Sequence, residues 1–144
     1  MQNRTVYTGG TFDVLHAGHV NFLRQCKEIA GKGKVVVSLN TDEFINSYKG
    51  VNPVFSYSER KRLLEQLEYV DEVVENTGNS DSKIAILKVR PKFIVIGSDW
   101  ASKDYYSQME FTQEWLDKHG IILVYVPYTL LISTSEIKKR LKNG

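Results

Sequence analysis

The sequence contains a single cysteine, Cys26, among its 144 residues. It can therefore form no intrachain disulfide and no cysteine cluster that would bind a metal. No apolar run approaches the ~20 residues that a membrane-spanning helix needs, and residues 1–4 lead into a β-branched segment without the apolar stretch of a secretory signal. The net charge of +2 is too small to argue for binding to nucleic acid. These absences favour a cytoplasmic protein with neither a membrane nor a nucleic-acid partner.

Internal repeats and low-complexity tracts are absent as well. The contents of 42% hydrophobic and 25% charged residues are ordinary for a globular protein, so we expect a single domain over residues 1–144. Cys26 falls on the apolar stripe of a predicted helix, and we interpret it as a core residue. The basic triplet at residues 138–140 is expected on the solvated side of a final helix.

Short β-branched segments alternate with segments of helical periodicity along the whole chain. The predicted strands cover residues 5–8, 34–40, 72–75, 93–96 and 122–126. The predicted helices cover residues 19–30, 41–47, 58–67, 82–89, 106–119 and 133–142. Near-continuous apolar strands such as residues 93–96 indicate burial on both faces. The alternation predicts an α/β fold of Rossmann-like type, in which a doubly wound parallel five-stranded sheet carries helices on both faces.

Polar and glycine-containing segments follow four of these strands. In a sheet of this kind ligands bind beyond the carboxyl ends of the strands, where the strand order reverses. The four segments, at residues 9–19, 40–42, 97–100 and 127–135, are therefore expected to converge on one rim. Two loops are long enough to move, at residues 48–56 and 76–81.

The motif His16-Ala17-Gly18-His19 lies at the start of the first predicted helix, directly after Gly9 and Gly10. Two imidazoles three residues apart lie on one face of a helix start, where unpaired backbone N–H groups already favour anions. The pattern therefore predicts a phosphate-binding site. The alternatives are a buried histidine pair or half of a zinc site.

With this motif the chain resembles the HxGH nucleotidyltransferase superfamily, and within it the small cytidylyltransferases. The resemblance continues in the family's order through residues 41–44, 57–61, 69–73, 97–100 and 132–135. It implies transfer of CMP from CTP to a phosphorylated alcohol, with release of pyrophosphate. Mg²⁺ is expected to arrive with the nucleotide, held by its phosphates, and we predict no metal site built from protein side chains alone.

The resemblance also implies roles for individual residues of the first loop and helix start. His16 and His19 would contact the triphosphate and stabilise the transition state. Asp13 is predicted on the substrate side, where it orients a histidine, touches the ligand or only caps the turn. Further nucleotide contacts are implied for Gly10, Thr11, Phe12 and Gly18.

The start of the last predicted helix carries three consecutive hydroxyl residues, Ser133, Thr134 and Ser135. One such residue is ordinarily an N-cap, but three exceed what one cap needs, and the resemblance implies a second phosphate site there. The same resemblance places further nucleotide contacts at Asp99, Trp100, Thr129 and Ile132.

Three basic residues are candidates for binding the phosphates of the substrates. Lys49 matches a family lysine that reaches these phosphates, so we assign it a catalytic and substrate-binding role. Lys83 is a weaker acceptor-phosphate candidate, displaced by about one position from the family pattern. Arg60 either serves a phosphate or pairs with Glu59 or Asp71.

Two positions depart from the cytidylyltransferase pattern. Glu68 and Tyr128 stand where the small cytidylyltransferases usually have arginines on the nucleotide side. Sugar-phosphate adenylyltransferases of the superfamily lack these arginines too, so ATP is an alternative to CTP. A non-catalytic nucleotide-binding module is a further alternative. The acceptor is not identified, and we expect a homodimer because relatives often are homodimers.

Overall fold

The computed structural model describes residues 3–99, 103–127 and 134–143, except for the side chains of residues 134–137 and 143. Five parallel strands form one sheet in the order β3-β2-β1-β4-β5. The strands are β1 (Val6–Gly10), β2 (Val35–Leu39), β3 (Glu72–Glu75), β4 (Phe93–Gly97) and β5 (Ile122–Val126). The helices are α1 (Ala17–Ala30), α2 (Asp42–Lys49), α3 (Tyr57–Glu65), α4 (Lys83–Val89), α5 (Tyr105–Met109), α6 (Gln113–Lys118) and α7 (Thr134–Asn143).

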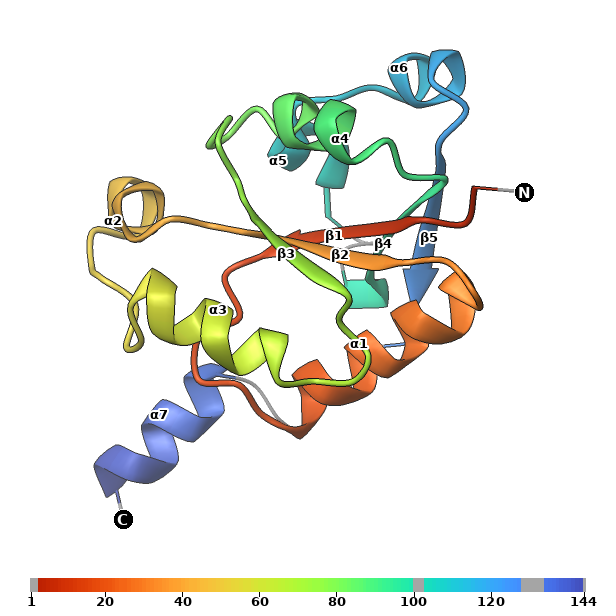
Figure 1. Ribbon diagram of the computed structural model, residues 1–144. Coiled ribbons are helices and arrows are strands. Elements are labelled where there is room, and N and C mark those ends of the chain that lie inside the picture. Colours follow the sequence, from red (N-terminus) through yellow and green to blue (C-terminus); the bar gives the residue numbers. More distant parts are fainter. Residues whose placement is uncertain (1–2, 100–102, 128–133, 144) are drawn as a thin grey trace.

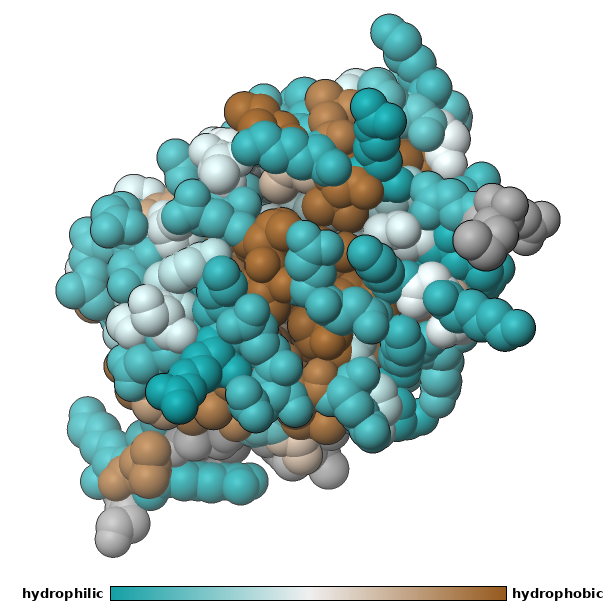
Figure 2. All heavy atoms as spheres, viewed as in Figure 1, coloured by the Kyte–Doolittle hydropathy of each residue, from teal (hydrophilic) through white to brown (hydrophobic). Residues whose placement is uncertain are grey.

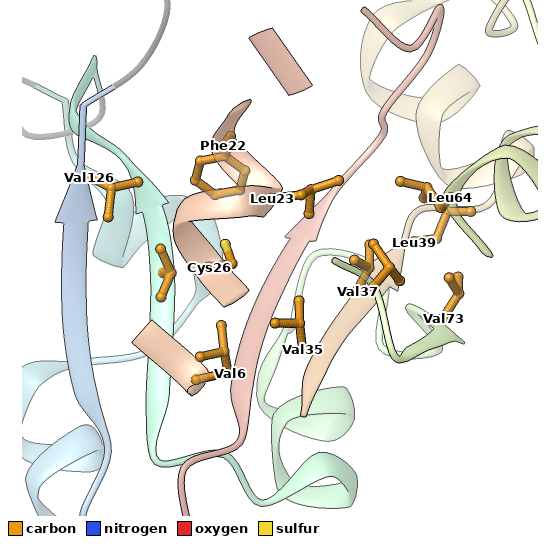
Figure 3. Close-up of a cluster of buried hydrophobic side chains, with 13 residues drawn as sticks. Val6, Phe22, Leu23, Cys26, Val35, Val37, Leu39, Leu64, Val73 and Val126 are labelled. Atoms are coloured by element: carbon orange, nitrogen blue, oxygen red, sulfur yellow. The ribbon is translucent and has the colours of Figure 1, made fainter. Parts of the chain in front are cut away.

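Helices cover both faces of the sheet, with α1 and α3 on one side and α4, α5 and α6 on the other (Figure 1). The period-2 alternation of the strands divides the core in the same way. Val6 packs in the cluster with α1 and α3, and its neighbour Tyr7 packs in the cluster with α4, α5 and α6. Figure 3 shows Phe22, Leu23 and Cys26 of α1 directed at the sheet, so Cys26 is the core residue we expected. The predicted doubly wound α/β fold is confirmed.

The strand order reverses between β1 and β4, which are neighbours although β2 and β3 come between them in the chain. Connections leave the carboxyl ends of these two strands in opposite directions, and this opens a crevice at the rim of the sheet. The chain from β1 to α1 and the residues after β4 therefore lie at one place in the molecule.

Several predicted element boundaries need correction by two or more residues. Gly9 and Gly10 form no turn but belong to β1, where they pair with Ser38 and Leu39 of β2. The first helix begins at Ala17 rather than two residues later. The second helix runs on to Lys49, at the start of what we interpreted as a loop, and ends at Gly50 with a left-handed φ of 74°.

The prediction of one helix over residues 106–119 is wrong. Glu110 adopts a left-handed φ of 58° and ends α5, and Thr112 caps α6 by accepting a hydrogen bond from the backbone N–H of Trp115. The break turns Phe111 into the core, where it packs with Tyr105 and Leu116. Burial of this aromatic side chain outweighs the continuity of the helix.

The face drawn in Figure 2 is mostly hydrophilic, but a band of hydrophobic residues runs down its middle, between α4 and α3. Leu63 of α3 and Ile84 and Leu87 of α4 are more than two-fifths exposed. The edge strand β3 lies between these helices (Figure 1). None of the helices within the described residues has both the length and the apolarity that crossing a membrane requires.

Candidate active site

The segment that joins β1 to α1 has a strained backbone. Phe12 and Val14 both adopt a φ of 49°. This left-handed region is uncommon for any residue with a side chain and costs most for a β-branched one such as Val14. Gly10 supports the arrangement, because a Cβ there would lie 3.0 Å from the Phe12 ring. Such strain persists only where surrounding contacts fix the segment.

Asp13, between the two strained residues, supplies one of these contacts. Its buried carboxylate accepts hydrogen bonds from the backbone N–H groups of Val54 and Phe55, at 2.7 and 2.9 Å. Lys138 of α7 lies 3.6 Å from the same carboxylate, so one residue of the basic triplet faces the site rather than solvent alone. Burial by itself would raise the pKa of Asp13, but the two amides and the Lys138 ammonium outweigh it and hold the pKa below its ordinary value. These contacts favour a positioning role for Asp13.

His16 and His19 form a stacked pair at the start of α1, with ring centroids 3.9 Å apart. His16 is the N-cap, and its Nδ1 accepts a hydrogen bond from the Gly18 backbone N–H at 3.0 Å. In return the His16 backbone N–H donates to Nδ1 of His19 at 3.2 Å. Since Nδ1 of both rings accepts, the neutral tautomer of each carries its proton on Nε2. Each ring therefore keeps one N–H for a ligand.

The environment of this pair keeps both imidazoles neutral. Burial lowers the pKa of His16, and burial together with the neighbouring His16 lowers the pKa of His19 to about 4. Nε2 of His16 is buried and has no hydrogen-bond partner among the described residues. A buried donor without a partner is costly, and the oxygen of a bound phosphate would satisfy it. The start of α1 therefore holds two uncharged imidazoles, each with an Nε2–H group as hydrogen-bond donor.

A small cavity of about 160 Å³ adjoins the histidine pair at the carboxyl ends of β1 and β4. His19 and Asp99, which are far apart in the sequence, both line it. The predicted nucleotide residues Gly10, Thr11 and Phe12 also line this cavity. Predicted Gly18 is buried inside the first turn of α1. The expected convergence on one rim is thus present for β1 and β4.

A second cavity, of about 400 Å³, lies on the other side of residues 9–11. It is lined by β1, α2, α5 and the segments that follow β2 and β3. Predicted Lys49 is its only charged residue among the described ones, and the Lys49 ammonium lies 5.8 Å from the centre of the Tyr48 ring. The two cavities share the edge formed by Gly9, Gly10 and Thr11, which we call the glycine edge. Two reactants can therefore bind side by side, one in each cavity.

The placement of Arg60 does not support its predicted role in substrate binding. Its side chain is completely buried, and its guanidinium donates to the backbone carbonyls of Thr11, Asn40 and Phe55. Its ion-pair partner is Asp42, at 2.6 Å, rather than either acidic residue considered from the sequence. Arg60 therefore fixes three segments around the site instead of facing a ligand.

Lys83 is also held within the protein. Its ammonium lies 3.0 Å from Asp81 and donates to the carbonyl of Glu110. It stands one residue beyond Ser82, which lines the larger cavity. Its acceptor-phosphate role stays a prediction.

Part of the predicted nucleotide site lies outside the described residues, namely Trp100, Thr129, Ile132 and Ser133. Thr134 and Ser135 begin α7 as expected, but only their backbone is described. The ion pair between Lys138 and Asp13 places this helix beside the segment from β1 to α1. Among the described residues, His, Cys, Asp and Glu side chains form no group of three that could hold a metal ion.

Asn40 and Asn76 also line the larger cavity. The sequence placed Asn40 in one of the four segments expected at the rim, but we predicted no individual contact for it and none for Asn76. Asn40 follows the last residue of β2, and Asn76 follows the last residue of β3. Their signal was present, because an amide directly after a parallel strand lies on the ligand-binding rim.

The fold and the histidine pair together define an α/β nucleotide-binding protein. A family model described as cytidylyltransferase-like matches residues 7–140. The chain belongs to this cytidylyltransferase-like family of nucleotidyltransferase enzymes, as its resemblance led us to expect.

Relatives of several kinds match most of the chain. It is 35% identical over 138 residues to the glycerol-3-phosphate cytidylyltransferase of Bacillus subtilis (strain 168), a match that covers 96% of this chain and 97% of that protein. It is 34% identical over 125 residues to the FAD synthase of Thermococcus kodakarensis, covering 85% and 79% of the two chains. Among solved structures, a lipopolysaccharide core biosynthesis protein from Thermoplasma volcanium matches with a TM-score of 0.70 and 27% identity, over 89% of this chain and 100% of that one.

Proposed function

We propose that this enzyme transfers CMP from CTP to a small phosphorylated alcohol or polyol similar to glycerol 3-phosphate. A phosphate oxygen of the acceptor attacks the α-phosphorus of CTP, and the bond from this phosphorus to the bridging oxygen breaks. Pyrophosphate leaves with the electron pair. Since the attacking oxygen is already anionic at neutral pH, the step requires no general base, and catalysis depends on positioning and on charge stabilisation.

The histidine pair is the observation that carries this proposal. His16 and His19 each retain an Nε2–H donor, and the one on His16 is buried without a partner. We place the triphosphate at this pair and at the start of α1, beside the small cavity that Asp99 lines. Preorganised donors of this kind stabilise charge that develops on the phosphates in the transition state.

The larger cavity is the proposed place for the acceptor. Lys49 lines it and would neutralise the acceptor phosphate while the phosphate approaches the nucleotide across Gly9 and Gly10. Mg²⁺ would enter as a complex with the nucleotide phosphates, which suits an ion that keeps several waters and takes few protein ligands.

Adenylyl transfer from ATP is the second candidate. The match to an FAD synthase supports it. The exposed Glu68 supports it as well, because the small cytidylyltransferases usually have an arginine at this position. The two candidates share the transfer chemistry and differ in the base of the nucleotide.

Pyrophosphate release tests both candidates. CTP and ATP are each incubated with Mg²⁺ and glycerol 3-phosphate, ribitol 5-phosphate, phosphocholine, phosphoethanolamine, heptose 1-phosphate or FMN. The proposal expects release with CTP and a phosphorylated polyol. Release with ATP alone would establish the second candidate. Nucleotide binding without release from any pair would favour a binding module and contradict both.

We also propose that the chain is a homodimer. The partly exposed Leu63, Ile84 and Leu87 beside the edge strand β3 support this, because an apolar band of this kind is more stable when covered. Light scattering should give about twice the chain mass of 16.5 kDa. A value of one chain mass at micromolar concentration would contradict the dimer.

A further inference from the structure

One residue that lines the larger cavity has a buried hydrogen-bond acceptor without a partner among the described residues. Asn76 is only 7% exposed and lines this cavity. Its Nδ2 donates to the carbonyl of Asn79 at 2.8 Å and to Oδ1 of Asn40 at 2.9 Å. Its Oδ1 is buried and makes no hydrogen bond within the described part of the chain.

The orientation of this amide follows from its neighbours. A backbone carbonyl can only accept, so the nitrogen of Asn76 has to face Asn79 and the oxygen has to face the other way. Asn79 presents its carbonyl from a left-handed backbone, with a φ of 54°. The free position is therefore an acceptor and not a donor.

A chain of hydrogen bonds connects the Asn76 amide through Asn40 to Thr11, the last residue of the glycine edge. Asn40 receives the bond from Asn76 and donates from its own Nδ2 to Oγ1 of Thr11 at 3.2 Å. Thr11 Oγ1 also lies 3.2 Å from the Tyr48 hydroxyl. Asn76 is thus fixed relative to Thr11, which lines both cavities.

We propose that Oδ1 of Asn76 accepts a hydrogen bond from a hydroxyl group of the acceptor, and that this selects a phosphorylated polyol as substrate. This inference rests on the proposed function, because it assigns the larger cavity to the acceptor. An acceptor without the hydroxyl would leave the buried Asn76 oxygen unpaired, which is how polar sites reject such analogues most strongly.

The charge of the cavity supports a neutral polyol over a phosphorylated amine. No carboxylate is among its described lining residues, and Lys49 is the one charged group there. An aromatic ring attracts ammonium groups, but the Tyr48 ring already has the ammonium of Lys49 5.8 Å from its centre. A second cation in this cavity would be repelled.

The test compares two acceptors of the same length, glycerol 3-phosphate and propyl phosphate, with the wild type and Asn76→Ala. The wild type should favour glycerol 3-phosphate in kcat/KM by about tenfold to a hundredfold, which is the effect of leaving one buried neutral acceptor unpaired. Asn76→Ala should lose most of this preference by slowing only the hydroxylated acceptor, with the KM for nucleotide unchanged. Asn46→Ala is the matched control, since Asn46 is exposed on α2 and bonds to Asn52 outside this cavity.

Each result decides the inference. Similar kcat/KM values of the wild type for the two acceptors, or a preference for phosphocholine, would overturn it, as would an equal loss on both acceptors in Asn76→Ala. If Asn76→Ala does not fold, Asn76→Ser is expected to keep part of the preference because its hydroxyl can accept. Failure of the wild type to release pyrophosphate with every phosphorylated acceptor would contradict the proposed function itself, and is distinguishable from these results.

Discussion

His16 and His19 each accept a backbone hydrogen bond at Nδ1, so the neutral form of each ring carries its proton on Nε2, where we propose that the triphosphate binds. Removal of one such donor from a preorganised site typically costs 10²–10³ in kcat. We expect His16→Asn and His19→Asn each to lower the rate of pyrophosphate release by this factor. His119→Asn is the control, since the third histidine lies exposed beyond α6. Equal rates in the two site variants and the control would rule out the proposed role.

The low pKa of His19 also predicts how stability depends on pH. The folded pKa of about 4 lies below the ordinary value of 6.5, so between these values only the unfolded chain binds the proton. The free energy of unfolding is then unaffected by His19 above pH 6.5 and falls as the pH drops toward 4. The slope from one such group reaches about 1.4 kcal/mol per pH unit.

Urea unfolding of the wild type and of His19→Asn at pH values from 7 to 4 checks this prediction. His19→Asn should show a shallower loss of stability than the wild type over this window. Parallel curves would mean that His19 is already protonated in the folded protein.

At the residue scale, sequence patterns predicted features that regular helix geometry fixes. They missed features that depend on irregular backbone or on segments distant in the sequence. The histidine pair was predictable because a spacing of three at a helix start places both rings together. The proposed role of Asn76 was not predictable from the sequence. The backbone carbonyl of Asn79 accepts a hydrogen bond from the amide nitrogen of Asn76, and the amide oxygen is left unpaired as a result. The environment of Arg60 likewise comes from three segments that only the fold brings together.

At the scale of elements, Arg60 of α3 ties together the ends of β1 and β2 and the segment before α3. We expect Arg60→Met to lower the free energy of unfolding by about 3 kcal/mol, because it leaves the part-buried carbonyls of Thr11, Asn40 and Phe55 without the donor that the buried guanidinium supplies. Since these carbonyls flank the site, the KM for nucleotide should rise as well. The exposed neighbour Arg62 gives the control, and Arg62→Met should change stability by less than about 0.5 kcal/mol. Similar stabilities of the two variants would refute this positioning role.

The break between α5 and α6 gives a prediction with a definite sign. Glu110 has a left-handed backbone that glycine adopts without strain. Glu110→Gly should therefore raise the free energy of unfolding by about 0.5 kcal/mol. In the single helix that the sequence suggested, the same change would lower it by about 1 kcal/mol. Chemical denaturation distinguishes the two, and a loss of that size would contradict the observed break.

The elements themselves were largely predictable, since apolar runs and caps mark them locally. All five strands appear in the predicted places, and the helices shift by only a few residues except in one region. The exception is residues 106–119, where the prediction of one helix was wrong. Burial of Phe111 in the core interrupts the helix there, and helical periodicity alone does not indicate that this residue is buried.

At the scale of the whole molecule, the strand reversal between β1 and β4 determines where the two cavities lie. It sets His19 and Asp99 around one cavity and Lys49 and Asn76 around another, with Gly9, Gly10 and Thr11 between them. The doubly wound parallel sheet followed from the alternation of elements, whereas the order of its strands comes from the structure. The division into two cavities depends on side chains from α2 and α5 that sequence patterns do not position.

The proposed function requires that one active site joins a nucleotide to a phosphorylated acceptor. ³¹P NMR of the wild type with CTP, Mg²⁺ and glycerol 3-phosphate measures this directly. We expect a new diphosphate diester and pyrophosphate in equal amounts, with neither formed at a comparable rate by the His16→Asn variant. Release of orthophosphate instead, or unchanged CTP and ATP signals with every phosphorylated acceptor, would contradict it.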